Sequence, residues 1–145
     1  MKILVTGASG VVGRRAVPQL AAAGHDISAV VRSRAKGFLL ENAGARTIQV
    51  DLFDREALRA AVAGHDVVIN LATHIPASTT RMLLPFAWRE NDRIRRIASA
   101  NMVDAALAGG VKRFIQESFA PVYPDSGDSW INEEAPIAPT RYNST

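Results

Sequence analysis

The sequence predicts an α/β fold built on a doubly wound parallel sheet. Short apolar runs that suit buried strands alternate with longer stretches of helical periodicity along the 145-residue chain. A glycine-rich turn follows the first apolar run directly. Because right-handed crossovers through helices place successive strands parallel, we expect the strand order 3-2-1-4-5, with helices on both faces of the sheet.

The expected elements follow one another with short connections. Strands are expected at residues 2–5, 27–31, 47–50, 67–70 and 112–117, and helices at residues 13–24, 35–43, 54–64 and 86–109. Asp54 is the expected N-cap of the third helix, and Gly24 and Gly44 are expected to end the first two. Pro18 lacks the N–H that an interior helical position donates, so we expect a kink there. Residues 73–85 are expected to form a loop.

The turn after the first strand carries the main functional signal. Gly7, Gly10 and Gly13 recur at intervals of three between an apolar strand and an amphipathic helix. We expect the first to permit a tight turn, the second to let backbone N–H groups approach a pyrophosphate, and the third to allow close packing of the helix. The helix N-terminus then favours an anion. The pattern predicts a bound dinucleotide, and a strand–helix turn without a ligand is the alternative.

The segment Thr6 to Gly13 resembles the T-G-x-x-G-x-x-G signature of the short-chain dehydrogenase/reductase superfamily, in its extended and atypical branches, which include NAD-dependent epimerase/dehydratase-like proteins. The resemblance runs along nearly the whole chain and implies a Rossmann-type NAD(P)-binding domain. It places Asp51 and Leu52 beside the adenine, although a helix-entry turn equally explains Asp51. The implied cofactor-binding residues are Thr6, Gly7, Ser9, Gly10, Val11, Val12, Gly13, Arg32, Arg34, Asp51, Leu52, Asn70, Leu71 and Ala72.

Arg32 indicates which dinucleotide is preferred. It ends the second strand about 20 residues after the glycine-rich turn, where an NAD-specific site carries an acidic residue for the ribose 2′-OH. A guanidinium can pair with a 2′-phosphate but offers a ribose hydroxyl no acceptor. With Arg34 nearby, the sequence predicts a preference for NADP(H), with NAD(H) as the lesser cofactor. A basic surface loop is the alternative interpretation.

The residues after the fifth strand carry an incomplete catalytic pattern. Ser118 to Tyr123 resembles the family segment S-S-x-x-V-Y, but the catalytic hydroxyl position falls on Phe119, so Ser118 is the candidate substitute. Tyr142 resembles the tyrosine of Y-x-x-x-K, which exchanges the proton during hydride transfer. The lysine, which would lower the tyrosine pKa, corresponds to residue 146. We therefore expect Tyr142 and Ser118 to be the catalytic residues, and the 145-residue chain alone to be inactive.

The domain organisation is expected to be simple. Residues 1–145 are expected to form one NAD(P)-binding domain, in which 118–145 supply an active-site loop region and the start of the tyrosine helix. We expect no substrate domain within these residues, and we interpret the chain as the N-terminal half of an NADP-dependent oxidoreductase or sugar-nucleotide epimerase/dehydratase. Two alternatives stay open, namely a non-catalytic NAD(P) sensor or scaffold and a homodimer formed through the exposed fifth strand.

Composition restricts the other function classes. The chain is 48% hydrophobic and 21% charged, contains no cysteine and carries a formal net charge of +3. Its basic residues are scattered without interleaved aromatics, and no run approaches the about 18 apolar residues of a membrane span. The histidines share no metal-ligand spacing. We therefore expect a cytoplasmic protein whose partners are a dinucleotide and a small-molecule substrate, with no nucleic acid, membrane or metal.

Overall fold

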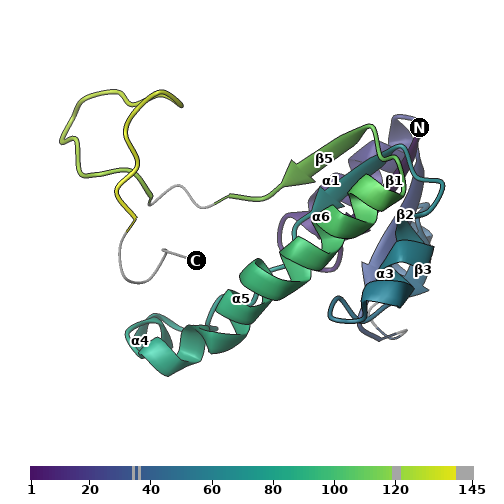
Figure 1. Cartoon of the computed structure of the whole chain (residues 1–145), viewed down its shortest axis with the longest axis horizontal. Coiled ribbons are helices and arrows are strands. Elements are labelled where there is room, and N and C mark those ends of the chain that lie inside the picture. The colour runs from purple at the N-terminus through teal and green to yellow at the C-terminus, as the bar shows by residue number, and fades with distance from the viewer. Residues whose placement is uncertain (34, 36, 119–121, 140–145) are drawn as a thin grey trace.

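The computed structural model describes residues 1–33, 35, 37–118 and 122–139. Its centre is a five-stranded sheet in the order β3-β2-β1-β4-β5, in which every neighbouring pair is parallel. Figure 1 shows the strands side by side with helices packed against them. The predicted fold class and strand order are confirmed.

The elements lie close to the expected positions. The strands are β1 (Lys2–Thr6), β2 (Asp26–Val31), β3 (Arg46–Gln49), β4 (Val67–Asn70) and β5 (Arg113–Gln116). The helical elements are α1 (Gly13–Ala22), α2 (Phe38–Asn42), α3 (Arg55–Val62), α4 (Thr79–Met82), η2 (Pro85–Trp88), α5 (Arg89–Arg93), the π-helical turn η3 (Ile94–Ala98) and α6 (Ser99–Ala108).

The three inner strands β2, β1 and β4 are buried on both faces, which explains why they are mainly apolar, whereas the edge strands β3 and β5 carry exposed polar residues at their ends. Side chains alternate between faces along a strand. In β1, Ile3 and Val5 join the cluster that packs on α1 and α2, whereas Leu4 joins the cluster that packs on α3 and α6. These three side chains are at most 2% exposed. Two hydrophobic layers therefore hold the central strand in place from opposite sides.

The helix ends follow local sequence signals. Asp54 caps α3, since its Oδ1 accepts hydrogen bonds from the N–H groups of Glu56 at 3.1 Å and Ala57 at 3.0 Å. Gly24 follows α1 with φ +80° and Gly44 follows α2 with φ +87°, the left-handed conformation that glycine adopts most readily. The predicted cap and both predicted helix ends are confirmed.

Two expectations about residues 73–109 were too simple. The presumed loop contains α4, where the Ser78 hydroxyl accepts a hydrogen bond from the Arg81 N–H at 3.4 Å. The single expected helix is divided into η2, α5, the π-helical turn η3 and α6. Figure 1 shows this series of helices extending well beyond the sheet, with α4 at its far end.

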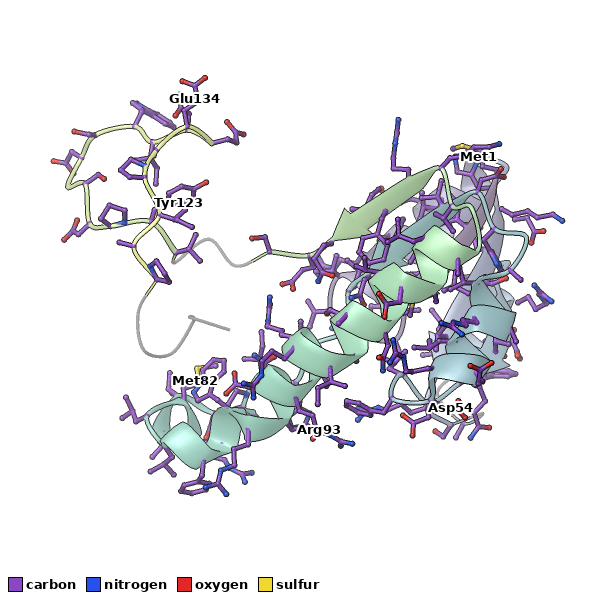
Figure 2. All side chains as sticks on the ribbon, in the orientation of Figure 1. Met1, Asp54, Met82, Arg93, Tyr123 and Glu134 are labelled. Carbon is purple, nitrogen blue, oxygen red and sulfur yellow. The ribbon has the colours of Figure 1, made fainter. Side chains whose placement is uncertain are left out.

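Residues 122–139 form an arm that lies apart from the sheet (Figure 1). Apart from the 3-10 residue Val122 at its start, the arm contains no assigned helix or strand, and its ends meet through a hydrogen bond of 2.7 Å from the Ala138 N–H to the Val122 carbonyl. Trp130 is fully exposed on this arm, and Figure 2 shows Tyr123 and Glu134 on it, far from Met1.

Within the described ranges, no helix is both long and apolar enough to span a membrane.

Candidate functional site

Two glycines of the glycine-rich turn lie against backbone atoms that leave no room for a side chain. Gly7 has φ +64°, and a Cβ there would lie 2.2 Å from the Leu71 carbonyl oxygen. A Cβ on Gly13 would lie 2.5 Å from the carbonyl oxygens of both Gly7 and Ala8. At Gly10 the only atom within 4 Å of a Cβ would be the Gly7 oxygen, at 3.1 Å. Gly7 and Gly13 are thus required by the fold, whereas Gly10 keeps the surface of the turn open.

Three cavities adjoin one another at the carboxyl end of the sheet, where the parallel strands finish. The central cavity, of about 290 Å³, is lined by Gly7, Ser9, Gly10, Val30, Val31, Arg32, Val50, Leu52, Leu71, Ala72, Thr73 and Ile94. The β3-side cavity, of about 340 Å³, is lined by Arg32, Gln49, Val50, Asp51, Leu52, Phe53, Glu90 and Ile94. The loop-side cavity, of about 290 Å³, is lined by Gly7, Gly10, Val11, Val12, Gly13, Leu71, Thr73, Ile75 and Glu117.

The cavities share lining residues and so form one series across the sheet. Arg32 and Ile94 border both the central and β3-side cavities, while Leu71 and Thr73 border both the central and loop-side cavities. The series crosses the point between β1 and β4 where the strand order reverses. Ligands of open α/β sheets bind at such a switch point. Most of the predicted cofactor-binding residues are brought together here.

The start of α1 is open toward this series. Its N-cap residue, Val12, makes no side-chain capping hydrogen bond, unlike Asp54 at the start of α3. Val11, Val12 and Gly13 all line the loop-side cavity. The first turn of a helix presents N–H groups without intrahelical partners and a partial positive charge. This end of the helix can therefore hold an anion.

Thr6 and Asn70 occupy a different environment from the other predicted binding residues. Asn70 is 2% exposed, and its Nδ2 donates to Gln116 Oε1 at 2.9 Å and to Ser99 Oγ at 3.2 Å. Its Oδ1 accepts hydrogen bonds from the Thr6 hydroxyl and, at 3.4 Å, from the Ala72 N–H. The amide thus joins the ends of β1, β4 and β5 to α6. Neither Thr6 nor Asn70 is among the residues that line the three cavities.

Arg32 is an exposed cation immediately after β2. Its carbonyl oxygen accepts a hydrogen bond from Gln49 Nε2 at 3.3 Å, which ties the end of β2 to β3. Within the described part of the chain its guanidinium makes no ion pair or hydrogen bond, so its donors can bind a ligand anion. Arg34, the second predicted arginine, lies outside the described residues.

Asp51 both shapes a turn and borders a cavity. Its Oδ1 accepts a hydrogen bond from the Phe53 N–H at 3.0 Å, and its carbonyl accepts from the Asp54 N–H at 3.1 Å. It lines the β3-side cavity together with Leu52. The turn that leads into α3 therefore forms a wall of this cavity, so the two interpretations of Asp51 are compatible.

Several lining residues lie on the long helical segment and were not predicted from the sequence. Glu90 and Ile94 reach the β3-side cavity from α5 and η3. The Arg93 guanidinium stacks 3.6 Å from the centre of the Phe53 ring, and Figure 2 shows Arg93 directed toward the region of Asp54. Glu90 and Ile94 are four residues apart and so share a helix face, but only the fold shows that this face meets the cavity.

The loop-side cavity is also lined by a carboxylate that was not predicted from the sequence. Glu117 follows β5 and lines this cavity, and its Oε2 lies 2.8 Å from Arg95 Nη2. The Arg95 and Glu117 side chains are only 20% and 26% exposed. The ion pair therefore ties the π-helical turn to the end of β5 beside the glycine-rich turn.

Of the two predicted catalytic residues, only Ser118 lies among the residues that the structure describes. Ser118 is exposed after β5 and lines none of the three cavities. Tyr142 and Phe119 lie outside the described residues. Among the residues that the structure describes, no group of three metal-ligating side chains is present.

The titratable groups whose pKa values are clearly shifted lie at the amino end of the sheet, opposite the cavities. Asp66 accepts hydrogen bonds from Lys112 Nζ at 2.8 Å and from the Lys2 N–H at 2.9 Å. These interactions lower the pKa of Asp66 from 3.8 to about 2, and the same hydrogen bond raises the pKa of Lys112. This charged cluster connects the starts of β1, β4 and β5.

Comparison with known proteins gives a consistent result. Residues 7–141 match the family described as NAD(P)H-binding. The chain is 34% identical over 142 residues to a 3-diazoavenalumate denitrifying reductase from a Streptomyces species, covering 94% of this chain and 44% of the reductase. It therefore spans less than half the length of this curated relative.

Solved structures share the same architecture. The chain superposes with a TM-score of 0.77 on the UDP-Glc/GlcNAc 4-epimerase of Campylobacter jejuni, at 23% identity over 96% of this chain and 43% of the epimerase. A short-chain dehydrogenase/reductase superfamily protein from Agrobacterium tumefaciens with bound NAD gives a TM-score of 0.71 at 26% identity, over 98% of this chain and 40% of that protein. The superposition on the epimerase establishes the fold of this chain.

Proposed function

Because the chain belongs to the NAD(P)H-binding family, we propose that its three cavities hold one dinucleotide and that NADP(H) binds more tightly than NAD(H). We further propose that the whole protein is an oxidoreductase or a sugar-nucleotide epimerase/dehydratase that transfers hydride. The family membership agrees with the resemblance to the extended and atypical short-chain dehydrogenases/reductases.

The order of the cavities supports one orientation of the dinucleotide. The pyrophosphate lies across Gly10 at the open start of α1, where no side chain occupies the N–H groups. The adenosine half extends toward the β3-side cavity and the nicotinamide half toward Leu71, Ala72 and the loop-side cavity. A ligand in this orientation contacts Ser9, Val11 and Val12 along the turn.

The position of Arg32 is the observation that supports a preference for NADP(H) over NAD(H). It borders the passage between the central and β3-side cavities, and its guanidinium has no partner among the described residues. A ribose 2′-phosphate placed there gains a bidentate charged partner, whereas a ribose 2′-OH finds no acceptor on this side chain. Arg34 adds positive charge nearby in the sequence.

The catalytic part of the proposal rests on the resemblance. In the whole protein, Tyr142 exchanges a proton with the substrate oxygen while hydride passes to or from the nicotinamide, and Ser118 binds that oxygen. The competing proposal is a non-catalytic NAD(P) sensor or scaffold. Phe119 favours it, because phenylalanine stands where the extended enzymes carry the catalytic hydroxyl.

Thermal unfolding with NADPH and NADH tests the binding proposal. Ligand at about 100 times its dissociation constant stabilises a fold by roughly 2.7 kcal/mol, which is readily measured. We expect NADPH to raise the melting temperature more than NADH at equal concentration. Arg32→Gln should remove the difference and Arg32→Asp should reverse it.

Arg113→Gln is the matched control, since Arg113 is also an exposed arginine but lies at the amino end of the sheet. It should leave the NADPH preference intact. Equal shifts with the two cofactors in the unmodified chain would contradict the NADP preference. Absence of any shift in a cooperatively unfolding sample would contradict dinucleotide binding altogether.

A further inference from the structure

Glu117 places a negative charge on the wall of the loop-side cavity. Of the described residues that line this cavity, it alone carries a formal charge, and the rest are glycines, a threonine or apolar residues. Its backbone N–H donates a hydrogen bond of 3.0 Å to the Asn70 carbonyl, so it lies beside the exit of β4. Leu71, the next residue after β4, lines the same cavity. The backbone therefore fixes Glu117 on the side toward which the nicotinamide half is proposed to extend.

Arg95 compensates this charge without entering the cavity. Its Nη2 lies 2.8 Å from Glu117 Oε2, and the Arg95 and Glu117 side chains are only 20% and 26% exposed. Water and salt therefore screen this pair less than they screen a fully exposed pair. Glu117 lines the loop-side cavity, whereas Arg95 lines none of the three cavities. The ion pair thus presents its carboxylate to the cavity and holds its cation outside.

The nicotinamide ring is the part of the dinucleotide whose charge depends on oxidation state. The ring is positively charged in NADP⁺ and neutral in NADPH, while the pyrophosphate, the riboses and the adenine are the same in both. A carboxylate near the ring therefore stabilises the oxidised form relative to the reduced form, and a cation there has the opposite effect. An effect on the pyrophosphate changes the binding of both forms equally, so it cancels in the ratio of their dissociation constants.

We propose that the Glu117–Arg95 ion pair sets the preference of the site for the oxidised or the reduced cofactor, an inference that rests on the proposed dinucleotide function. Glu117 attracts the positive ring of NADP⁺, and Arg95 limits that attraction by neutralising the carboxylate from outside the cavity. Tighter binding of NADP⁺ makes bound NADPH a stronger hydride donor, because loss of hydride leaves the ring positive. The ion pair consequently controls the direction in which the bound cofactor is poised to react.

The test is the ratio of the dissociation constants of NADP⁺ and NADPH, measured at one pH and ionic strength. NADPH binding is followed by its nicotinamide fluorescence, and NADP⁺ binding by displacement of NADPH. Arg95→Gln leaves the carboxylate unpaired, so it should shift the ratio about tenfold toward NADP⁺, which corresponds to about 1.4 kcal/mol. Glu117→Gln leaves the guanidinium uncompensated and should shift the ratio toward NADPH, by about threefold because Arg95 does not line the cavity.

Further variants separate the charge of the pair from its packing. In Glu117→Gln the amide oxygen can still accept the hydrogen bond from Arg95, so the connection between η3 and β5 is retained. Arg95→Lys keeps the positive charge and should keep the ratio of the unmodified chain. The double variant that combines Arg95→Gln with Glu117→Gln should give a ratio between those of the two single variants.

Arg55→Gln is the matched control. Arg55 Nη2 lies 2.6 Å from Asp104 Oδ2 and so also joins two elements through an ion pair, but neither residue lines any of the three cavities. This variant should leave the ratio unchanged.

Opposite shifts in the two single variants are the result that a purely structural ion pair would not produce. Weakening of both cofactors by the same factor, with the ratio unchanged in Arg95→Gln or Glu117→Gln, would overturn the proposal. Shifts in the same direction in the two variants would overturn it as well. Failure of the unmodified chain to bind either cofactor would overturn the proposed function itself.

Discussion

At the amino end of the sheet, charged groups neutralise one another, whereas at the carboxyl end the guanidinium of Arg32 remains open to a ligand. Asp66 is satisfied by Lys112 Nζ and the Lys2 N–H within 2.9 Å. Arg32, at the other end, borders two cavities and has no partner in the described part of the chain. The same strands thus carry a cluster that stabilises the sheet at one end and a surface able to bind an anion at the other.

The largest expected effect comes from the turn at the carboxyl end. In Gly7→Ala the new Cβ would meet the Leu71 carbonyl at 2.2 Å and the backbone would retain φ +64°. The free energy of unfolding should fall by about 3 kcal/mol or more, and dinucleotide binding should be lost. Chemical denaturation and cofactor titration measure the two effects.

Gly64→Ala separates the two causes of that loss. Gly64 has φ +77°, but a Cβ there would meet nothing within 4 Å. Only the backbone strain remains, so the loss should be about 1 kcal/mol, and cofactor binding should persist. Similar losses in the two variants would contradict the close-contact explanation for Gly7.

A smaller effect is expected from the buried amide that joins the strand ends. Asn70→Leu conserves much of the volume but leaves the groups on Thr6, Ser99 and Gln116 without their partner. We expect the free energy of unfolding to fall by about 2 kcal/mol. In Asn42→Leu, a change at an exposed helix end, the loss should stay within about 0.5 kcal/mol. A neutral Asn70→Leu would remove Asn70 from the stabilising network.

The smallest effect concerns the amino end and depends on pH. The pKa of Asp66 is lowered to about 2 from 3.8, so the contribution of this carboxylate to stability is present above its unfolded pKa and is lost as the pH falls through 2. Asp66→Asn should therefore lower the melting temperature at pH 7, and the difference from the unmodified chain should vanish near pH 2. NADPH affinity at pH 7 should not change. A change in that affinity would show that the two ends are coupled.

The sequence predicted those features that depend on local pattern. The apolar runs and the intervals between them were sufficient for the strand order, because crossover connections allow few alternatives. Asp54 and Gly24 marked helix ends through short-range signals. The requirement for glycine at position 7 could also be predicted, although its cause, the carbonyl of Leu71, is distant in sequence.

The rest depended on contacts between distant segments. Asn70 and Glu90 each lie in an ordinary local context, and only packing directs the first into a buried network and the second to a cavity. The π-helical turn that begins at Ile94 divides a segment whose periodicity suggested one regular helix. Such features arise from the fold as a whole, so a single sequence carries little signal for them.

An NMR titration of the chain with NADPH, monitored at assigned backbone amides, shows directly which end of the sheet binds the dinucleotide. We expect saturable chemical-shift changes at Gly7 to Gly13, at Arg32 and at Leu71 to Thr73, with Asp66 and Lys112 unaffected. Changes that centre on Asp66 and Lys112, or the absence of saturable changes around the glycine-rich turn, would contradict the assignment of the carboxyl end as the binding surface.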